Sequence, residues 1–293
     1  MQDKPDSAVL IVGCGDIGRR VASLLRTPRY SPTCIVRSDA SLNALLEAGF
    51  DARCIDLDTA ADAAGLPAGY AEIFYFAPPP PAGETDPRMA GFLQWLHRDA
   101  PPRRIVYIST SAVYGDCGGA WITEEQPLAP ATARGWRRLD AERQLMAWCG
   151  ETGCEWIVLR VPGIYGPGKL PLARLRQGLP VLREADAPYT NRIHVDDLAA
   201  ICVASMSSRH KNTVYNVSDG HPGNMTDYFF RVADAAGLPR PPVVGREEAQ
   251  QVLSPGMLSF LNDSRRMDNT RLLKELGITL RYPDLDTGLA SCF

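Results

Sequence analysis

The stretch AVLIVGCGDIGRRVA, residues 8–22, decides the fold of this chain. It begins with a short apolar run, passes through glycines spaced as G-x-G-x-x-G, and continues into apolar residues at helical spacing. This order predicts a strand, a tight turn and a helix, which together form the first unit of a dinucleotide-binding sheet. If the rest of the chain has the same fold, further apolar strands and helices should alternate after this unit.

The turn of this stretch predicts a phosphate site. Gly13 allows the tight turn, Gly15 lets the backbone approach a pyrophosphate, and Gly18 lets the helix lie close to the strand. The backbone N–H groups at the helix start, those of Asp16 and Ile17 among them, then face the anion. A tight turn without a ligand is the alternative, and the coincidence of strand, glycines and helix favours the site.

The first half of the chain alternates apolar runs with helix-like segments. We expect strands at 8–12, 33–36, 53–57, 72–76, 105–108 and 156–160. Helices are expected to follow residue 16, to begin at a cap formed by Ser41, and to cover 92–96 and 137–149. Strands that are apolar on both faces and separated by helices predict an α/β fold with a Rossmann-like doubly wound parallel sheet.

The regular alternation of strand-like and helix-like segments ends after Tyr165, where a turn cluster and several short elements follow. We expect residues 1–165 and 192–218 to form the dinucleotide-binding domain. Residues 166–191 and 219–293 are expected to form a smaller substrate-side domain, with the dinucleotide lying across the carboxyl ends of the strands.

Composition narrows the class of protein. The 293 residues are 45% hydrophobic and 22% charged with a net charge of −3, so we expect neither disorder nor a nucleic-acid partner. No apolar stretch reaches the ~20 residues of a membrane span, and the polar start does not resemble a signal peptide. The eight cysteines form no CxxC pair and the four histidines are scattered. We therefore expect a cytoplasmic protein without disulfides or a bound metal.

The end of the second strand predicts which dinucleotide binds. NAD-dependent enzymes usually carry an acidic residue there for the ribose hydroxyls, whereas an arginine can pair with the 2′-phosphate of NADP. This strand ends IVRSDAS, with Arg37 and Ser38 first and Asp39 one position further. The order favours NADP over NAD, and the alternatives are a loop role for Arg37 and a ribose contact by Asp39.

These motifs together resemble the extended short-chain dehydrogenase/reductase superfamily, also called NAD-dependent epimerase/dehydratase-like proteins. GCGDIG is similar to its first-turn fingerprint, ISTSAVYG (residues 108–115) to its fifth-strand signature, and RIHVDDLA (residues 192–199) and YNVSDG (residues 215–220) to later motifs. The resemblance covers nearly the whole chain and allows a homodimer.

The resemblance also implies further contacts to the cofactor. In IDLD, Asp56 and Leu57 take the place of residues that hold the adenine. YFAPPP puts Ala77 and Pro78 beside the cofactor, and LRVPGIYGPG puts Val161 and Pro162 beside the nicotinamide.

The active site departs from the family pattern. The resemblance implies a Tyr-x-x-x-Lys pair on one helix, for proton transfer and for the ribose, and a Ser or Thr on the fifth strand that polarises the substrate oxygen. Thr110 matches the Ser/Thr position. In ATARGWRRLDAERQL (residues 131–145), Arg134 takes the Tyr position and Arg138 the Lys position. An arginine can hold a ribose or an anionic substrate group, but it does not shuttle protons.

Two hypotheses follow from this departure. The first is an atypical family member, an NADP-binding oxidoreductase or epimerase/dehydratase-like enzyme for a small carbonyl, alcohol or sugar-like substrate. Thr110, Arg134 and Arg138 are then the catalytic candidates. The second is a dinucleotide-binding sensor or scaffold that catalyses nothing.

Other polar residues near the cleft are expected to be structural. Tyr114 and Tyr165 are conceivable substitute acids, but buried tyrosines more often pack their rings and hydrogen-bond their hydroxyls. A cap by Asp196 or Asp197 is expected at the start of the helix that follows His194.

Overall fold

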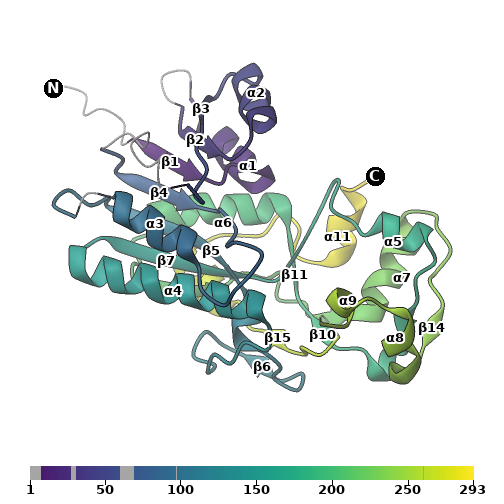
Figure 1. Ribbon diagram of the computed structural model, residues 1–293. Helices are drawn as coiled ribbons and strands as arrows, with labels where there is room; N and C mark the ends of the chain where they lie inside the picture. The colour runs from purple at the N-terminus through teal and green to yellow at the C-terminus, as the bar shows by residue number, and fades with distance from the viewer. Residues whose placement is uncertain (1–7, 28–30, 60–68, 97, 260) are drawn as a thin grey trace.

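A seven-stranded parallel sheet lies at the centre of the protein (Figure 1). The computed structural model describes residues 8–27, 31–59, 69–96, 98–259 and 261–293, so the chain start and His97 lie outside the described part. From one edge to the other the strands are β12 (Thr213–Asn216), β7 (Glu155–Val161), β5 (Arg104–Thr110), β4 (Glu72–Tyr75), β1 (Val9–Val12), β2 (Thr33–Val36) and β3 (Asp51–Cys54).

The strand order reverses at β1. β2 and β3 continue the sheet on one side of β1, and β4, β5 and β7 continue it on the other. Val12 at the end of β1 is paired with Ile35 of β2 and with Tyr75 of β4. The carboxyl ends of the strands at such a reversal form the crevice in which ligands bind in open α/β sheets.

Helices cover both faces of the sheet. One face carries α1 (Asp16–Leu25), α2 (Asp39–Glu47), α6 (Val195–Ser207) and α10 (Thr270–Leu276), and the other carries α3 (Pro87–Trp95) and α4 (Ala133–Thr152). Two neighbouring residues of β4 point to opposite faces of the sheet. Phe74 packs with Val21 of α1, and Tyr75 packs with Phe92 of α3. The predicted doubly wound α/β fold is confirmed.

Shorter elements gather beside the sheet, on the right in Figure 1. They are β9 (Val181–Leu182), β10 (Tyr189–Thr190), β13 (Gly223–Asn224), β14 (Val243–Val244), α5 (Leu172–Arg176), α7 (Met225–Ala235), α8 (Arg246–Val252), α9 (Pro255–Ser259) and α11 (Leu285–Ala290). Several of these helices share an apolar cluster that includes Leu175, Phe229 and Leu289.

Two further strand pairs tie these elements to the sheet. β8 (Gly163–Tyr165) pairs with β11 (Arg192–His194), and β6 (Trp121–Ile122) pairs with β15 (Arg266–Met267). Leu272 and Leu280 also belong to the apolar cluster of the first sheet face. Residues 270–280 therefore pack beside the sheet, whereas α11 returns to the apolar cluster of α5 and α7.

Two predictions were wrong, one about the cap of α2 and one about the bounds of the third strand. Ser38, not Ser41, caps α2, because the Ser38 side chain accepts a hydrogen bond from the Ser41 backbone N–H. The third strand covers Asp51–Cys54 instead of 53–57, and most of its side chains are exposed. The strand lies at the edge of the sheet, and Cys54 in it is exposed.

The cap of α6 also differs from the prediction. The Nδ1 atom of His194 accepts from the backbone N–H of Asp196 at 3.2 Å, so the histidine itself caps the helix. Asp197 instead accepts from the backbone N–H groups of Arg281 and Tyr282, at 2.8 and 2.9 Å. Both contacts are structural, as expected for this segment.

Candidate functional site

The carboxyl ends of β1, β2 and β4 surround a cavity of about 410 Å³. Eight residues predicted to bind a dinucleotide line it together: Gly13, Gly15, Arg37, Ser38, Asp56, Leu57, Ala77 and Pro78. The sequence analysis missed Ser41 and Arg88, which also line it. Ser41 follows the predicted ribose position by three residues, which is one helical turn, and this spacing was the available signal.

The turn after β1 has the shape that a pyrophosphate needs. Gly13 has a φ of +82°, and a Cβ atom there would lie 2.4 Å from the backbone nitrogen of Ala77. A Cβ atom on Gly15 would meet nothing within 4 Å. No side chain caps the start of α1, so backbone N–H groups of its first turn, which begins at Asp16 and Ile17, are available to an anion. These features fit a bound dinucleotide.

Gly18 and Asp16 lie behind this turn and do not line the cavity. A Cβ atom on Gly18 would lie 3.1 Å from the Cys14 sulfur, which agrees with its predicted role in close packing. The Asp16 carboxylate lies 2.9 Å from Lys169 Nζ and 3.4 Å from Arg20 Nε. Desolvation opposes ionisation there, but these two cations hold the pKa of Asp16 below its usual value.

A charged cluster lies at the ribose side of the cavity. The Arg88 guanidinium donates to both carboxylate oxygens of Asp58, at 2.7 and 2.6 Å, and to the Pro78 carbonyl at 2.8 Å. Arg88 lowers the pKa of Asp58, and the charge of Arg37 contributes to this shift. Arg37 and Arg88 are thus both near the exposed Ser38, and the carboxylates of Asp56 and Asp58 balance their two charges. Asp39, the rival ribose ligand, does not line the cavity.

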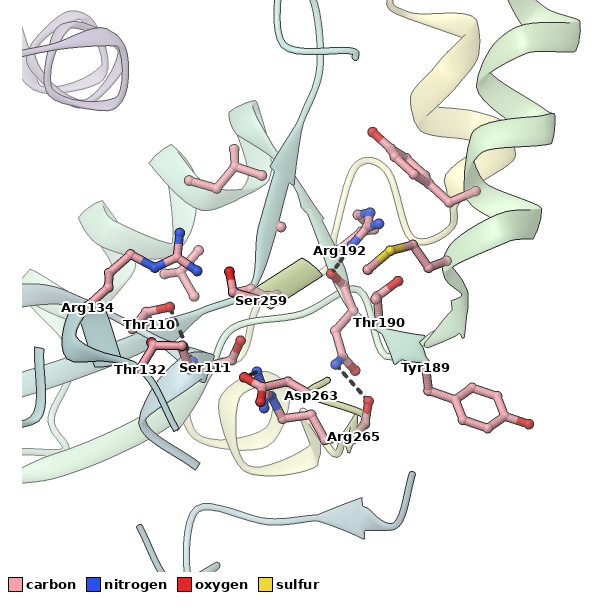
Figure 2. Close-up of a pocket in the computed structure, with 18 of the residues that line it drawn as sticks. Thr110, Ser111, Thr132, Arg134, Tyr189, Thr190, Arg192, Ser259, Asp263 and Arg265 are labelled. Carbon is pink, nitrogen blue, oxygen red and sulfur yellow. Dashed lines mark hydrogen bonds and ion pairs between the residues drawn. The ribbon is translucent and has the colours of Figure 1, made fainter. Parts of the chain in front are cut away.

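A second cavity of about 700 Å³ lies between the ends of β5 and β7 and the shorter elements (Figure 2). All three catalytic candidates, Thr110, Arg134 and Arg138, line it, as do Val161 and Pro162. The Thr110 side-chain oxygen accepts from the backbone N–H of Ala112 at 3.3 Å. Its own hydroxyl hydrogen can therefore still be donated to a ligand.

The two arginines of α4 are oriented differently. Arg138 Nη1 donates to the Ile108 carbonyl at 2.9 Å and to the Tyr107 hydroxyl at 3.3 Å, so it is held against β5. Arg134 lies beside Thr110 in Figure 2. Desolvation, followed by the charge of Arg138, lowers the pKa of Arg134. Both arginines line the cavity, and Arg138 is the one that is hydrogen-bonded to β5.

The tyrosines considered as substitute acids are structural. The Tyr114 hydroxyl donates to Asn216 Oδ1 at 2.7 Å and accepts from Arg160 at 3.0 Å. The Tyr165 hydroxyl donates to the Asp284 carbonyl at 3.1 Å. Burial raises the pKa of Tyr114 to about 12 and raises that of Tyr165 further. Neither tyrosine lines the second cavity.

Within the described ranges, no helix is long and apolar enough to cross a membrane. The same residues contain no group of three or more His, Cys, Asp or Glu side chains arranged to hold a metal ion.

Comparison with protein families identifies one match. Residues 89–218 match the sequence model of the NAD dependent epimerase/dehydratase family. A 3-diazoavenalumate denitrifying reductase from a Streptomyces species is 28% identical over 201 residues. That alignment covers 66% of this chain and 66% of the reductase, so the chain spans just under two thirds of this relative.

Solved structures resemble the protein over almost its full length. A conserved protein of unknown function from Silicibacter pomeroyi is 31% identical, covers 97% of both chains and has a TM-score of 0.81. The UDP-glucuronic acid 4-epimerase from Bacillus cereus, solved with NAD, is 16% identical, covers 97% of both chains and has a TM-score of 0.75. At that identity the second likeness concerns the fold.

Proposed function

We propose that this chain, which belongs to the NAD dependent epimerase/dehydratase family, is an NADP-dependent oxidoreductase for a small carbonyl or alcohol substrate. The observation that carries the proposal is the position of Thr110. Its hydroxyl lines the larger cavity at the end of β5, next to the strand ends that surround the dinucleotide cavity. The fold of the B. cereus epimerase, solved with NAD, supports a pyridine dinucleotide, and the Streptomyces relative supports a reductase.

The chain's own residues suggest how the reaction proceeds. A bound NADPH supplies a hydride to the carbonyl carbon of the substrate. Thr110 donates a hydrogen bond to the carbonyl oxygen, and the Arg134 guanidinium stabilises the negative charge that develops there. Because an arginine stays charged, we assign the proton that completes the alcohol to water. Arg138, held against β5, is a candidate to contact the nicotinamide ribose.

Replacement of Thr110 tests this function. Thr110→Val keeps the shape of the side chain and removes the hydroxyl, so kcat/KM for a reducible carbonyl compound is expected to fall about 100-fold. NADPH affinity is expected to stay unchanged. NADPH oxidation is followed at saturating cofactor, with Ser259→Ala as the control, since that hydroxyl also lines the cavity but donates to Gly256.

The same assay separates the enzyme from the sensor. If wild-type protein binds NADPH but oxidises it with no member of a broad panel of aldehydes and ketones, the enzyme proposal is wrong. The absence of a tyrosine at the position of Arg134 would then favour the non-catalytic dinucleotide-binding alternative.

A second prediction concerns the choice of NADP. Arg37→Ala is expected to weaken NADPH binding about 10- to 150-fold, because a charge-assisted hydrogen bond contributes roughly 1.5–3 kcal/mol. NADH affinity should stay the same, since NADH lacks the 2′-phosphate. Titration of both cofactors measures the effect, and Arg53→Ala on the neighbouring strand β3 is the matched control.

Two outcomes contradict this cofactor assignment. Equal weakening of NADPH and NADH makes Arg37 a structural residue. A wild-type preference for NADH makes NAD the cofactor and Asp39 the candidate ribose ligand.

A further inference from the structure

The larger cavity concentrates positive charge in a protein whose net charge is −3. Its lining contains one carboxylate, Asp263, and six cations: Arg134, Arg138, Lys169, Arg174, Arg192 and Arg265. Clefts lined by one sign of charge attract ligands of the opposite sign. The cavity is therefore suited to an anionic ligand, and the question is which cation receives it.

Four of these cations already have partners that hold them. Lys169 lies 2.9 Å from the Asp16 carboxylate, and Arg265 lies 3.3 Å from Asp263. Arg138 donates to two oxygen atoms of β5. Arg174 donates to the Pro180 carbonyl at 2.9 Å and stacks on the Phe229 ring.

Arg192 resembles Arg174 in its contacts, but its strand is paired with the residues that follow β7, which links it to Thr110. Its guanidinium carbon lies 4.0 Å from the centre of the Tyr228 ring, and its Nη1 donates to the Asn191 carbonyl at 2.9 Å. Among the described residues no carboxylate lies within 4.0 Å of it. Burial is the main cause that lowers the pKa of Arg192, so the cation has lost much of its water without gaining an ion-pair partner. A desolvated cation of this kind gains most from an incoming anion.

The nearby carboxylate is turned elsewhere. Asp219 donates its backbone N–H to the Arg192 carbonyl at 2.8 Å, but its side chain accepts from the His221 backbone N–H at 2.9 Å. Burial raises the pKa of Asp219 to about 6. Asp219 interacts with Arg192 electrostatically but does not accept a hydrogen bond from its guanidinium.

Strand pairing connects Arg192 to the strand that carries Thr110. Arg192 is paired with Gly163 of β8, and a Cβ atom on Gly163 would lie 2.8 Å from Arg192 Nη1. Gly163 follows Pro162 directly, and Val161 is paired with Thr110 of β5. Two strand pairings and the short step from Val161 to Gly163 therefore connect Thr110 to Arg192, and both residues line the cavity. Figure 2 shows Arg134 and Arg192 on opposite sides of the cavity.

We propose that Arg192 is a specificity-determining residue that binds an oxyanion group of the substrate, while the reacting carbonyl of the same molecule lies at Thr110. This inference rests on the proposed function. The substrate class is then a small carbonyl compound with a carboxylate or a phosphate ester at one end and an apolar body. Met225, Tyr228 and Phe229 of α7 line the cavity and supply an apolar surface for that body.

The test uses three aldehydes that share one ring. 4-Formylbenzoate and 4-formylphenyl phosphate carry the two oxyanions, and 4-formylbenzamide is their neutral counterpart. Each is titrated by calorimetry into the protein saturated with NADP⁺, which cannot reduce the aldehyde, so that the heat reports binding alone. We expect at least one anion to bind about 10- to 150-fold more tightly than the amide, which is the range for a charge-assisted contact. The tighter of the two anions identifies the oxyanion.

Variants of Arg192 assign the preference to this residue. Arg192→Met should abolish it, and Arg192→Lys should restore part of it because the charge is kept. If Arg192→Met fails to fold, Gly163→Ala provides the test, since its methyl group displaces the guanidinium. Arg240→Met, which removes an exposed cation paired with Asp234, is the charge-matched control and should keep the preference.

Two results overturn the inference. They are the absence of any preference for an anion in the wild type, and a preference that Arg192→Met retains. Neither result affects NADPH binding, so failure of this inference is distinct from failure of the proposed function, which would appear as absent NADPH binding or turnover.

Discussion

Glu142→Ala is expected to destabilise the protein by about 3–5 kcal/mol, because it leaves a buried guanidinium without its counter-charge. Glu142 and Arg160 are 1% and 3% exposed. The Arg160 Nη2 atom donates to Glu142 Oε2 at 2.8 Å, and the Ser109 hydroxyl donates to the same carboxylate. Desolvation disfavours the charged form of Arg160, but Glu142 and Tyr114 raise its pKa above the usual value.

This ion pair joins the elements that carry the site. Glu142 lies on α4, Arg160 on β7 and Ser109 on β5, directly before Thr110. Loss of the carboxylate therefore also loosens the helix that presents Arg134. We expect the variant to show weaker cooperativity of unfolding as well as a lower free energy of unfolding.

Chemical denaturation of three variants measures the effect. Glu151→Ala is the control, since its ion pair with Arg98 is exposed and such pairs contribute about 1 kcal/mol or less. The double variant Glu142→Ala/Arg160→Met removes both charges and should recover part of the lost stability. A Glu142→Ala variant within 1 kcal/mol of the wild type would show that Arg160 finds water or another partner.

The sheet could be predicted from the sequence because its strands are buried on both faces. The runs at β1, β2 and β4 consist of apolar residues bounded by turns, and the structure places them as expected. The edge strand β3 was misplaced because its exposed side chains carry no periodic apolar signal. The cap of α2 was also misassigned, since Ser38 and Ser41 are both good capping residues and only the backbone conformation distinguishes them.

The dinucleotide cavity was largely predictable, whereas the larger cavity was predicted only on the side that Thr110, Arg134 and Arg138 line. Glycines and strand ends keep a local spacing, so Gly15 and Arg37 could be found from the sequence alone. Arg88 was missed because its position depends on Asp58, thirty residues away, and on the Pro78 carbonyl. Arg192 was missed because it belongs to the site only through the pairing of β11 with β8.

The three glycines of the first turn differ in what the fold itself requires. Gly13 needs its positive φ, and Gly18 has the Cys14 sulfur close to the position of its missing Cβ atom. Gly15 has a φ of −77° and a ψ of −148°, and open space where its Cβ atom would be. Packing therefore does not require a glycine at position 15, but a ligand that approaches the backbone there does.

Gly15→Val should accordingly leave the thermal unfolding midpoint nearly unchanged and weaken NADPH binding at least 100-fold. The branched side chain would fill the space between the start of α1 and the pyrophosphate, so at least two charge-assisted hydrogen bonds of roughly 1.5–3 kcal/mol each are lost. Gly15→Ala should give an intermediate loss. Titration with NADPH and a thermal melt of the same samples provide the two readouts.

A cofactor fragment separates the pyrophosphate from the ribose end. Adenosine 2′-monophosphate has the 2′-phosphate assigned to Arg37 but no pyrophosphate. Gly15→Val should therefore bind it as the wild type does. Arg37→Ala should bind it more weakly. If Gly15→Val binds NADPH with wild-type affinity, the pyrophosphate does not lie against this turn. If it loses the fragment as well, the valine has displaced the neighbouring strand ends, and the loss of NADPH is structural.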